Sequence, residues 1–391
     1  MDMLDRNMIH AIASYLKIPE ATALRWVSRT FYEAEPLRAV SRITLTTGLN
    51  TILAEELGNL EAVDVEGIPS PLVMRKLGKA LQKVKRISFA AHARIPQEVL
   101  AIQGLPSLQE FRGHVSSNAD AFIGTLVADS PDIRVLEINF TSTNGAKSLA
   151  LIPDKVWPNL RRIVIRGGFA RVPIPWRNTL EHVEYYGACE SKWTGYMPLL
   201  KELIMHDDTI DDAGRLRDLP VLRHLGTNVY GMNLRAVLFE LGADTLRSLQ
   251  LRVIGPAPEN VTSLFSCLNR LVGLKVTGFV FNDLGSLTNK LEVLDVFCTW
   301  KAVGTLVRAI REGNYKKLRR LNLVFTADDD DDPCINALVE AAEALDSLKE
   351  LKVVPFHKRK TSVRYTAGAK RRSKQFSYRR RAATKTIHLE I

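Results

Sequence analysis

The stretch Leu318-Arg319-Arg320-Leu321-Asn322-Leu323 contains the pattern from which the fold of this 391-residue chain can be predicted. Side chains alternate between the two faces of a β-strand, so Leu321 and Leu323 point to one side while Arg320 and Asn322 point to the other. Each such strand has one apolar face to bury. The L-x-x-L-x-L spacing recurs, and the first apolar position of each copy falls at Leu60, Val84, Leu108, Ile133, Leu160, Leu180, Leu200, Leu222, Leu246, Leu271, Leu291, Leu318 and Leu348.

The distance between successive copies identifies the kind of repeat. Nearly all of the gaps fall within the roughly 20 to 29 residues that are typical of leucine-rich repeats. Segments between the strands, such as residues 337–345, have apolar residues at helical spacing. Because one repeat cannot bury its own apolar face, the repeats must stack. We therefore predict an α/β fold over residues 40–355, a solenoid with parallel strands on its concave face and helices on its convex face, entered by a strand at 42–45.

Composition narrows the class of protein. The chain is 46% hydrophobic and 25% charged, which is typical of a folded soluble protein. It has no run of about 18 apolar residues and does not begin with a basic and then apolar signal, so we expect an intracellular protein, cytoplasmic or nuclear. The four cysteines, Cys189, Cys267, Cys298 and Cys334, form no C-x-x-C pair. We expect them to be reduced thiols in or near the core.

Residues 1–39 do not follow the repeat. Their apolar residues are spaced as in two or three short helices, interrupted at Pro19. One interpretation is an N-terminal cap that covers the open end of the solenoid. The order of residues, and above all the segment Trp26-Val-Ser-Arg-Thr-Phe-Tyr32, also resembles the F-box family with its Val-Ser-x-x-Phe signature. The chain departs from that family at Leu4, which is followed by Asp5 where an F-box usually has proline.

An F-box followed by leucine-rich repeats is similar to the substrate receptors of SCF-type ubiquitin ligases, which contain a cullin. The resemblance implies that the helices bind a Skp-type adaptor and that the repeats bind a protein substrate. It also implies that the chain is not an enzyme and needs no cofactor. For each implied adaptor-binding residue the alternative is burial within the helical unit. These residues are Leu4, Ile9, Ile12, Leu16, Pro19, Leu24 and Val27.

The strand residues that alternate with the buried ones are the candidates for substrate binding on the concave face. They include Arg, His and Tyr side chains, which often anchor interfaces. The alternative is a solvated strand face that binds nothing. The candidates are Arg162, Arg166, His182, Glu184, Tyr186, Glu202, His206, Arg252 and Lys275.

The C-terminal region differs sharply in charge. From Pro355 onward there are twelve Lys and Arg and one Glu, so this region carries the whole net charge of +11. We predict a basic, disordered tail at 356–391, with a possible final strand at 386–391. The basic clusters are typical of nuclear import and also of sequence-independent contact with nucleic acid. They are Lys358, Arg359, Lys360, Lys370, Arg371, Arg372, Arg379, Arg380 and Arg381.

Motifs for catalysis or nucleotide binding are missing from the sequence, which has no G-x-x-x-x-G-K-[ST], G-x-G-x-x-G, G-x-S-x-G or H-E-x-x-H. The acidic stretches at 206–212 and 328–332 lack the pattern of a calcium loop and are typical of loops and helix caps, so we predict no metal site. The expected function is substrate recognition for an SCF-type ubiquitin ligase. Two alternatives stay open: a protein-interaction scaffold without a ligase role, and a protein that associates with nucleic acid through its tail.

Overall fold

The computed structural model describes residues 40–45, 57, 59–66, 77, 80–90, 105–115, 119–140, 152, 156–167, 174–186, 196–210, 212–241, 244–256, 262–288, 290–327, 332–357, 373–380 and 383–390. The helical unit expected at residues 1–39 lies outside the described residues. The chain divides into two compact units, Met1–Leu199 and Leu200–Ile391, which we call unit 1 and unit 2. Each unit is a solenoid-like α/β structure built on parallel strands.

Unit 1 contains seven described strands that pair in parallel in the order of the sequence. The strand at 42–45 is the expected entry strand, and it pairs with the next one. The described elements of the unit are β1 (Arg42–Leu45), β2 (Ala62–Val65), β3 (Arg86–Phe89), β4 (Glu110–Val115), α7 (Ala119–Asp129), β5 (Val135–Phe140), β6 (Arg162–Arg166), η2 (Ile174–Asn178) and β7 (His182–Tyr186).

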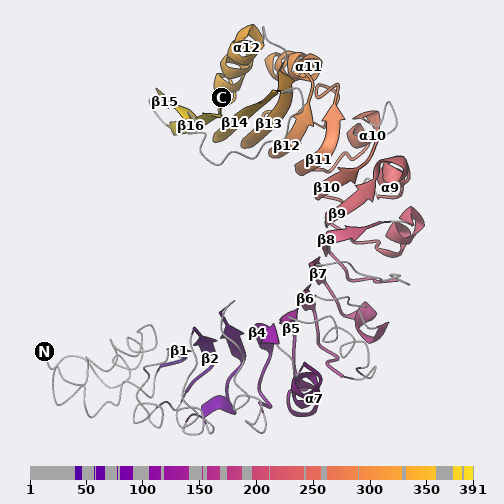
Figure 1. Cartoon of the computed structure of the whole chain (residues 1–391), viewed down its shortest axis with the longest axis vertical. Helices are drawn as coiled ribbons and strands as arrows, with labels where there is room; N and C mark the ends of the chain where they lie inside the picture. Colours follow the sequence, from indigo (N-terminus) through magenta and orange to yellow (C-terminus); the bar gives the residue numbers. More distant parts are fainter. Residues whose placement is uncertain are drawn as a thin grey trace, which may run out of the picture. The chain divides into compact units, whose positions relative to one another are not determined.

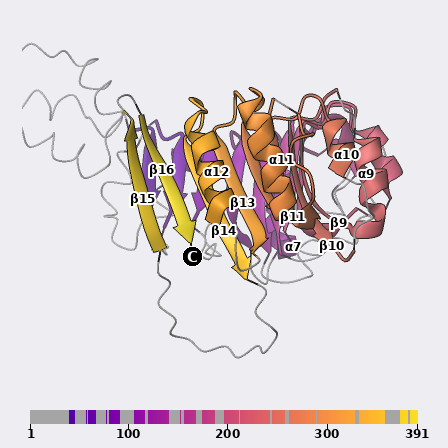
Figure 2. The ribbon, with the colours of Figure 1, turned by 90° about the horizontal axis from the view of Figure 1, so that it is seen from above.

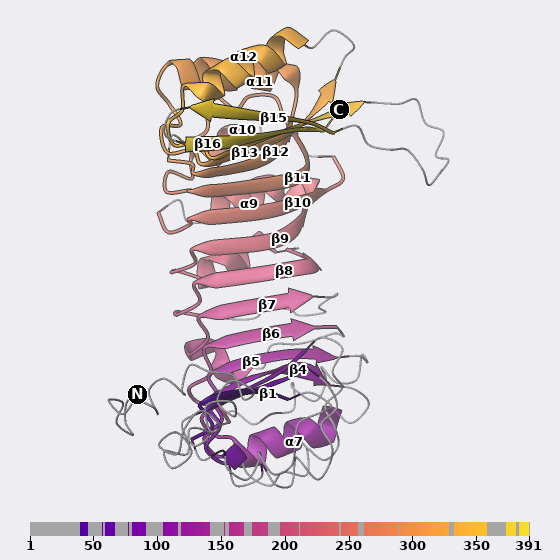
Figure 3. The ribbon, with the colours of Figure 1, turned by 90° about the vertical axis from the view of Figure 1, so that its left-hand side faces the viewer.

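Unit 2 continues the same pattern with longer strands, which run side by side and point the same way from β8 to β14 (Figure 3). Its elements before the C-terminal region are β8 (Glu202–Thr209), η3 (Ala213–Asp218), β9 (His224–Tyr230), η4 (Gly231–Asn233), α9 (Leu234–Glu240), β10 (Ser248–Ile254), α10 (Thr262–Ser266), β11 (Gly273–Phe281), β12 (Val293–Cys298), α11 (Trp300–Arg311), β13 (Arg320–Ala327), α12 (Asp332–Glu343) and β14 (Glu350–His357).

The repeat found in the sequence sets where the strands begin. Each strand from β2 to β14 begins two residues after the first apolar position of a copy, and that apolar residue is never more than 3% exposed. The backbone repeats as well: the amides of Arg319 and Arg320 both donate to the carbonyl of Glu292, at 2.8 and 3.0 Å. The amides of Lys349 and Glu350 donate in the same way to Arg319. The mixed α/β fold with stacked parallel strands is therefore confirmed.

The buried faces of the strands are covered by helices and turns. In unit 2, α9, α10, α11 and α12 lie on one side of the strands (Figure 1). Helix α11 is capped by Thr299, whose hydroxyl accepts from the amide of Ala302, and its apolar stripe from Ala302 to Ile310 is buried. An apolar stripe at helical spacing covers a strand face well because both surfaces are apolar and match in width.

In unit 1 two tryptophans cover the buried face of the strands. Trp157 and Trp176 are at most 1% exposed, and their rings stack with centroids 5.5 Å apart. The indole nitrogen of Trp157 donates to the carbonyl of Ser130 at 2.9 Å, and that of Trp176 donates to the carbonyl of Val156 at 2.7 Å. The Ser130 hydroxyl donates to Leu105 at 3.1 Å. These bonds each join neighbouring repeats, so they tie the stack together behind the strands.

Strand β11 contains a bulge. Its pairing with β12 shifts between Val276 and Val280, so the residues between them have no partner in the register. Gly278 lies in this bulge at φ 75°, and an added Cβ would lie 2.1 Å from the carbonyl oxygen of Val253. Only glycine adopts this backbone and tolerates this approach without strain. The bulge returns Val280 to the sheet opposite Phe297.

The C-terminal region adds two strands to unit 2, β15 (Ser373–Arg380) and β16 (Ala383–Glu390). Residues 386–390 of the possible final strand lie in β16, which pairs in parallel with β14, and Ile391 lies outside the described residues. Strand β15 pairs antiparallel with β16 and is the outermost strand, as Figure 2 shows. The tail expected from the sequence therefore contains a strand pair within residues 373–390.

The described cysteines differ in environment. Cys298 is buried, as expected, and burial raises the pKa of its thiol to about 12. Cys267 and Cys334 are exposed, so the expectation of core or near-core thiols was wrong for these two. Cys267 lies in the turn that follows α10, and Cys334 lies in the first turn of α12. None of the described helices is long and apolar enough to cross a membrane.

Candidate interaction surface on the strands

The candidate surface is the face of each sheet opposite the buried leucines, which we call the open face. It carries the alternate strand positions from which the substrate-binding candidates were chosen. In unit 1, Arg162, Arg166, Glu184 and Tyr186 lie on this face and are exposed or half-buried. His182 lies on it too but is only 8% exposed. The intervening residue of β6, Val164, is buried between Glu137 and Glu184 of the neighbouring strands.

Charged side chains on the open face of unit 1 neutralise one another across strands β4 to β7. Glu137 lies 3.7 Å from Nε of Arg112 and 3.1 Å from Nε of Arg162. Glu184 lies 3.7 Å from Arg162 and 3.4 Å from Nε2 of His182. Exposed ion pairs each stabilise a fold by only about 0.2–1 kcal/mol. These ion pairs join side chains of neighbouring strands.

An aromatic group lies at the end of this network. The guanidinium carbon of Arg166 lies 4.8 Å from the centre of the Tyr186 ring, a cation–π distance. A hydrogen bond with Glu184, burial, and the charge of Glu184 raise the pKa of Tyr186. On the adjacent strands, Asn139 and His114 lie 3.1 Å apart, and burial followed by the charge of Arg166 lowers the pKa of His114. Arg166 and Tyr186 therefore form a cation–π pair on the open face of unit 1.

In unit 2 the structure places Glu202 and His206 on β8, Arg252 on β10 and Lys275 on β11. Glu202 and His206 are half-buried, whereas Arg252 and Lys275 are exposed. Gln250 pairs in register with Lys275, so Arg252 and Lys275 are diagonal neighbours on one face. The open face of unit 2 thus brings two of the predicted residues together.

Asp295 of β12 is a central acidic group on the open face of unit 2, and it was not among the predicted site residues. Its carboxylate accepts a hydrogen bond from Nδ2 of Asn322 at 2.8 Å. Burial raises the pKa of Asp295, although Lys275, Asn322, Lys352 and Arg320 all act in the opposite direction. Desolvation of the carboxylate therefore outweighs the attraction of the cations around it.

Replacing Asp295 with asparagine tests this balance. A carboxyl group whose pKa is higher in the folded chain than in the unfolded one binds protons more tightly when folded. Its contribution to stability is thus present below the unfolded value of about 3.9 and is lost as the pH rises through the folded pKa. As the pH rises through the folded pKa of Asp295, we expect the free energy of unfolding of the Asp295→Asn variant to increase relative to that of the natural protein. The expected increase is less than about 1 kcal/mol. Urea unfolding at pH 4 and pH 7 measures this.

The opposite result has a clear meaning. If the natural protein is the more stable of the two at pH 7 but not at pH 4, the cations around Asp295 dominate and the inferred direction of its pKa is wrong.

Arg112, Glu137 and Asp295 are members of the open face that the sequence prediction missed. They occupy the same alternate strand positions as the predicted residues. The alternate position on a strand was therefore the sequence signal that could have identified them. Periodicity identifies the face of a strand, but it does not tell which neighbours on the face pair with one another.

The other predicted residues are not brought to this surface. All of the implied adaptor-binding residues and the basic residues from Lys358 to Arg372 lie outside the described residues, as does Arg381. Arg379 and Arg380 lie in β15. In the acidic stretch at 206–212, Asp212 caps η3, since its carboxylate accepts from the amide of Gly214 at 3.1 Å. No cluster of three His, Cys, Asp or Glu suited to a metal ion is present among the described residues.

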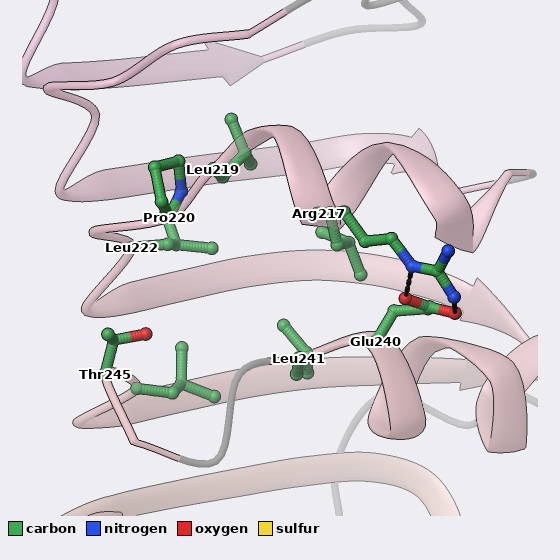
Figure 4. A pocket seen from close by; sticks show the side chains of 9 residues that line it. Arg217, Leu219, Pro220, Leu222, Glu240, Leu241 and Thr245 are labelled. Carbon is green, nitrogen blue, oxygen red and sulfur yellow. Dashed lines mark hydrogen bonds and ion pairs between the residues drawn. The ribbon is translucent and has the colours of Figure 1, made fainter.

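A pocket of about 140 Å³ lies between η3 and α9. Its wall is mainly leucine, with Arg217 and Glu240 forming a two-bond ion pair at its edge (Figure 4). Small-molecule sites usually measure about 300–1,000 Å³. The pocket is too small for most ligands, and the ion pair joins two consecutive repeats, so we assign it a structural role.

Comparison with known proteins adds no family. A scan against protein-family models gives no match to this chain, and a search of curated protein sequences also finds none.

Proposed function

We propose that this chain is the substrate-recognition adaptor of an SCF-type ubiquitin ligase. The observation that carries the proposal is the open face of the strands, where charged and aromatic side chains stand in fixed register on a rigid sheet. Such a face suits recognition of another protein because its polar groups are already held in place before contact. The resemblance of residues 4–32 to an F-box supports the ligase part of the proposal.

The proposed mechanism is positioning. The N-terminal helices would bind a Skp-type adaptor, and through it a cullin, while the open face holds the substrate. Holding an acceptor lysine near the loaded ubiquitin-transferring enzyme converts a bimolecular encounter into an effectively intramolecular one. The chain itself would make and break no bonds. Specificity would then depend on which proteins the open face accepts.

Two variants of the full-length chain test adaptor binding and substrate binding separately. Replacing Leu24 and Val27 with aspartate is expected to abolish binding to a purified Skp-type adaptor, because charged groups cannot enter an apolar helix-in-groove contact. The matched variant carries Arg166→Glu and Tyr186→Ala. It is expected to keep adaptor binding and lose captured partners. Pull-down from the protein's own cell extract, followed by mass spectrometry and reconstituted ubiquitin transfer to captured partners, provides the measurement.

The results separate the ligase from a scaffold. If the natural chain binds neither the Skp-type adaptor nor a cullin but retains partners that depend on Arg166 and Tyr186, the chain is a protein-interaction scaffold. If the adaptor binds and the captured partners receive ubiquitin only when it does, the ligase function holds.

A further inference from the structure

Exposed apolar side chains gather at the carboxyl ends of neighbouring strands in unit 2. Tyr230 of β9 is 42% exposed, Ile254 of β10 is 39% exposed, and Val280 of β11 is 43% exposed. Tyr230 and Ile254 are register partners, and both occupy the alternate positions that also place Arg252 on the open face. Val280 is the register partner of half-buried Phe297 on β12. We call Tyr230, Ile254, Val280 and Phe297 the apolar row.

The bulge in β11 is what puts Val280 into this row. Without the shift in register, the position opposite Phe297 would be taken by Thr277, a polar residue. The left-handed backbone of Gly278 and its close approach to Val253 make the shift possible. A β-bulge commonly re-aims a side chain at a functional surface. An apolar residue delivered in this way to solvent has no role in the core, since the buried face is already filled by Val276 and Phe281.

Two cations, Arg252 and Lys275, lie beside the apolar row. Lys275 of β11 is the register partner of Asp295 of β12, and its charge acts to lower the pKa of that carboxyl group. Among the described residues, no carboxylate lies within ion-pair distance of Arg252 or Lys275. Other arginines of the open faces do form ion pairs, as Arg320 does with Glu350 at 2.6 Å and Arg162 does with Glu137. Both Arg252 and Lys275 are exposed, so their positive charge lies at the surface beside the apolar row.

The arrangement indicates which chemistry the partner must have. Apolar contact supplies affinity at the centre of an interface, while complementary charge sets the orientation and suppresses wrong partners. Diagonal neighbours in a sheet lie about 7–8 Å apart, so Arg252 and Lys275 do not converge on one point. Two separate carboxylates match that spacing better than one phosphate group, which favours a cluster of donors around a single centre.

We propose that Arg252, Lys275 and the apolar row form a binding site for an acidic segment of a protein partner. Asp or Glu side chains of the segment contact Arg252 and Lys275, and an adjacent aromatic or aliphatic side chain packs on Tyr230, Ile254 and Val280. The inference rests on the proposed function, because it names the class of substrate that the adaptor would recognise.

The test uses the full chain and a phage-displayed library of random twelve-residue peptides. We expect the selected peptides to carry at least two Asp or Glu within a few residues of Phe, Trp, Leu or Ile. Their affinity should fall about tenfold or more for Arg252→Glu with Lys275→Glu, and by a similar factor for Ile254→Asp. The control is Lys301→Glu with Arg308→Glu, the same change of charge on exposed positions of α11, and it should leave affinity unchanged.

A charge swap provides the strictest check. Synthetic peptides in which the acidic residues are replaced by lysine should bind the Arg252→Glu and Lys275→Glu variant better than the natural chain. Thermal unfolding of each variant, followed by circular dichroism, shows that the fold is kept. Because all of the changed side chains are exposed, the midpoints should shift little.

Several results would overturn the proposal. These are selection of peptides without acidic residues, equal affinity for all variants, binding that requires a phosphate group, binding of nucleic acid at this face in place of peptide, or no selected peptide at all. Self-association of the chain through this face would also overturn it. Binding of a purified Skp-type adaptor is measured in parallel. If the natural chain selects the expected peptides but does not bind the adaptor, the ligase function alone is contradicted. If it binds the adaptor but does not select such peptides, the acidic-segment site alone is contradicted.

Discussion

Replacing Trp157 with alanine is expected to lower the free energy of unfolding by about 3–5 kcal/mol. The side chain is fully buried, stacks on Trp176, and donates a hydrogen bond to the carbonyl of Ser130. The substitution removes apolar contact, leaves a cavity, and leaves that buried carbonyl without the indole donor. Urea unfolding of the full chain, followed by circular dichroism at pH 7, measures the loss.

The matched control for Trp157 is Tyr196→Ala. Tyr196 is another large aromatic residue of unit 1, but it is 58% exposed. Its replacement should change stability by no more than about 0.5 kcal/mol. If the Trp157 and Tyr196 variants lose the same amount, Trp157 does not lie in the core and the packing of β5 to β7 differs from that described.

Replacing Leu323 with alanine is expected to cost about 2–5 kcal/mol, whereas Val324→Ala should cost well under half as much. The two residues are adjacent in β13. Leu323 is fully buried beneath α11 and α12, while Val324 lies half-buried on the open face. Leu323→Ala removes three carbons and Val324→Ala removes two, so the part of the difference beyond about 0.8 kcal/mol for one carbon measures burial.

Hydrogen exchange measured by mass spectrometry locates the effect of Leu323→Ala. Protection should fall in β13 and in β12 and β14, which pair with it on either side, because each repeat depends on its neighbours for stability. Equal losses for Leu323→Ala and Val324→Ala would mean that both faces of β13 are covered, and the open face would not be available to a partner.

Much of the fold follows from the sequence because the repeat is periodic at two levels. Alternation within Leu321-Asn322-Leu323 selects the buried face of a strand, and the recurrence of Leu318-like positions sets where the next strand begins. The C-terminal strands were harder to predict. The large aromatic residues of β15 are Phe376 and Tyr378, which stand beside three basic residues. Its partner β16 does not contain the L-x-x-L-x-L repeat, so the repeat does not predict that the two strands pair.

The sequence also predicted only part of the candidate surface. Alternation placed Arg162, Tyr186, Arg252 and Lys275 on the open face, since every second residue of such a strand must lie there. It did not identify Val280, because the bulge at Gly278 changes the alternation within β11. It also did not reveal that Glu137 is shared by two arginines while Arg252 has no carboxylate beside it among the described residues.

The sequence by itself therefore determined the class of fold, the positions of the strands and the face that each strand buries, because these depend on local periodicity. Tertiary structure alone decided which charges on the open face are neutralised and which remain available. Ion pairs such as Arg162 with Glu137, and the opposition of Val280 to Phe297, join residues from different repeats. Their formation depends on the register between strands, and a bulge or a one-residue shift in that register changes which side chains meet.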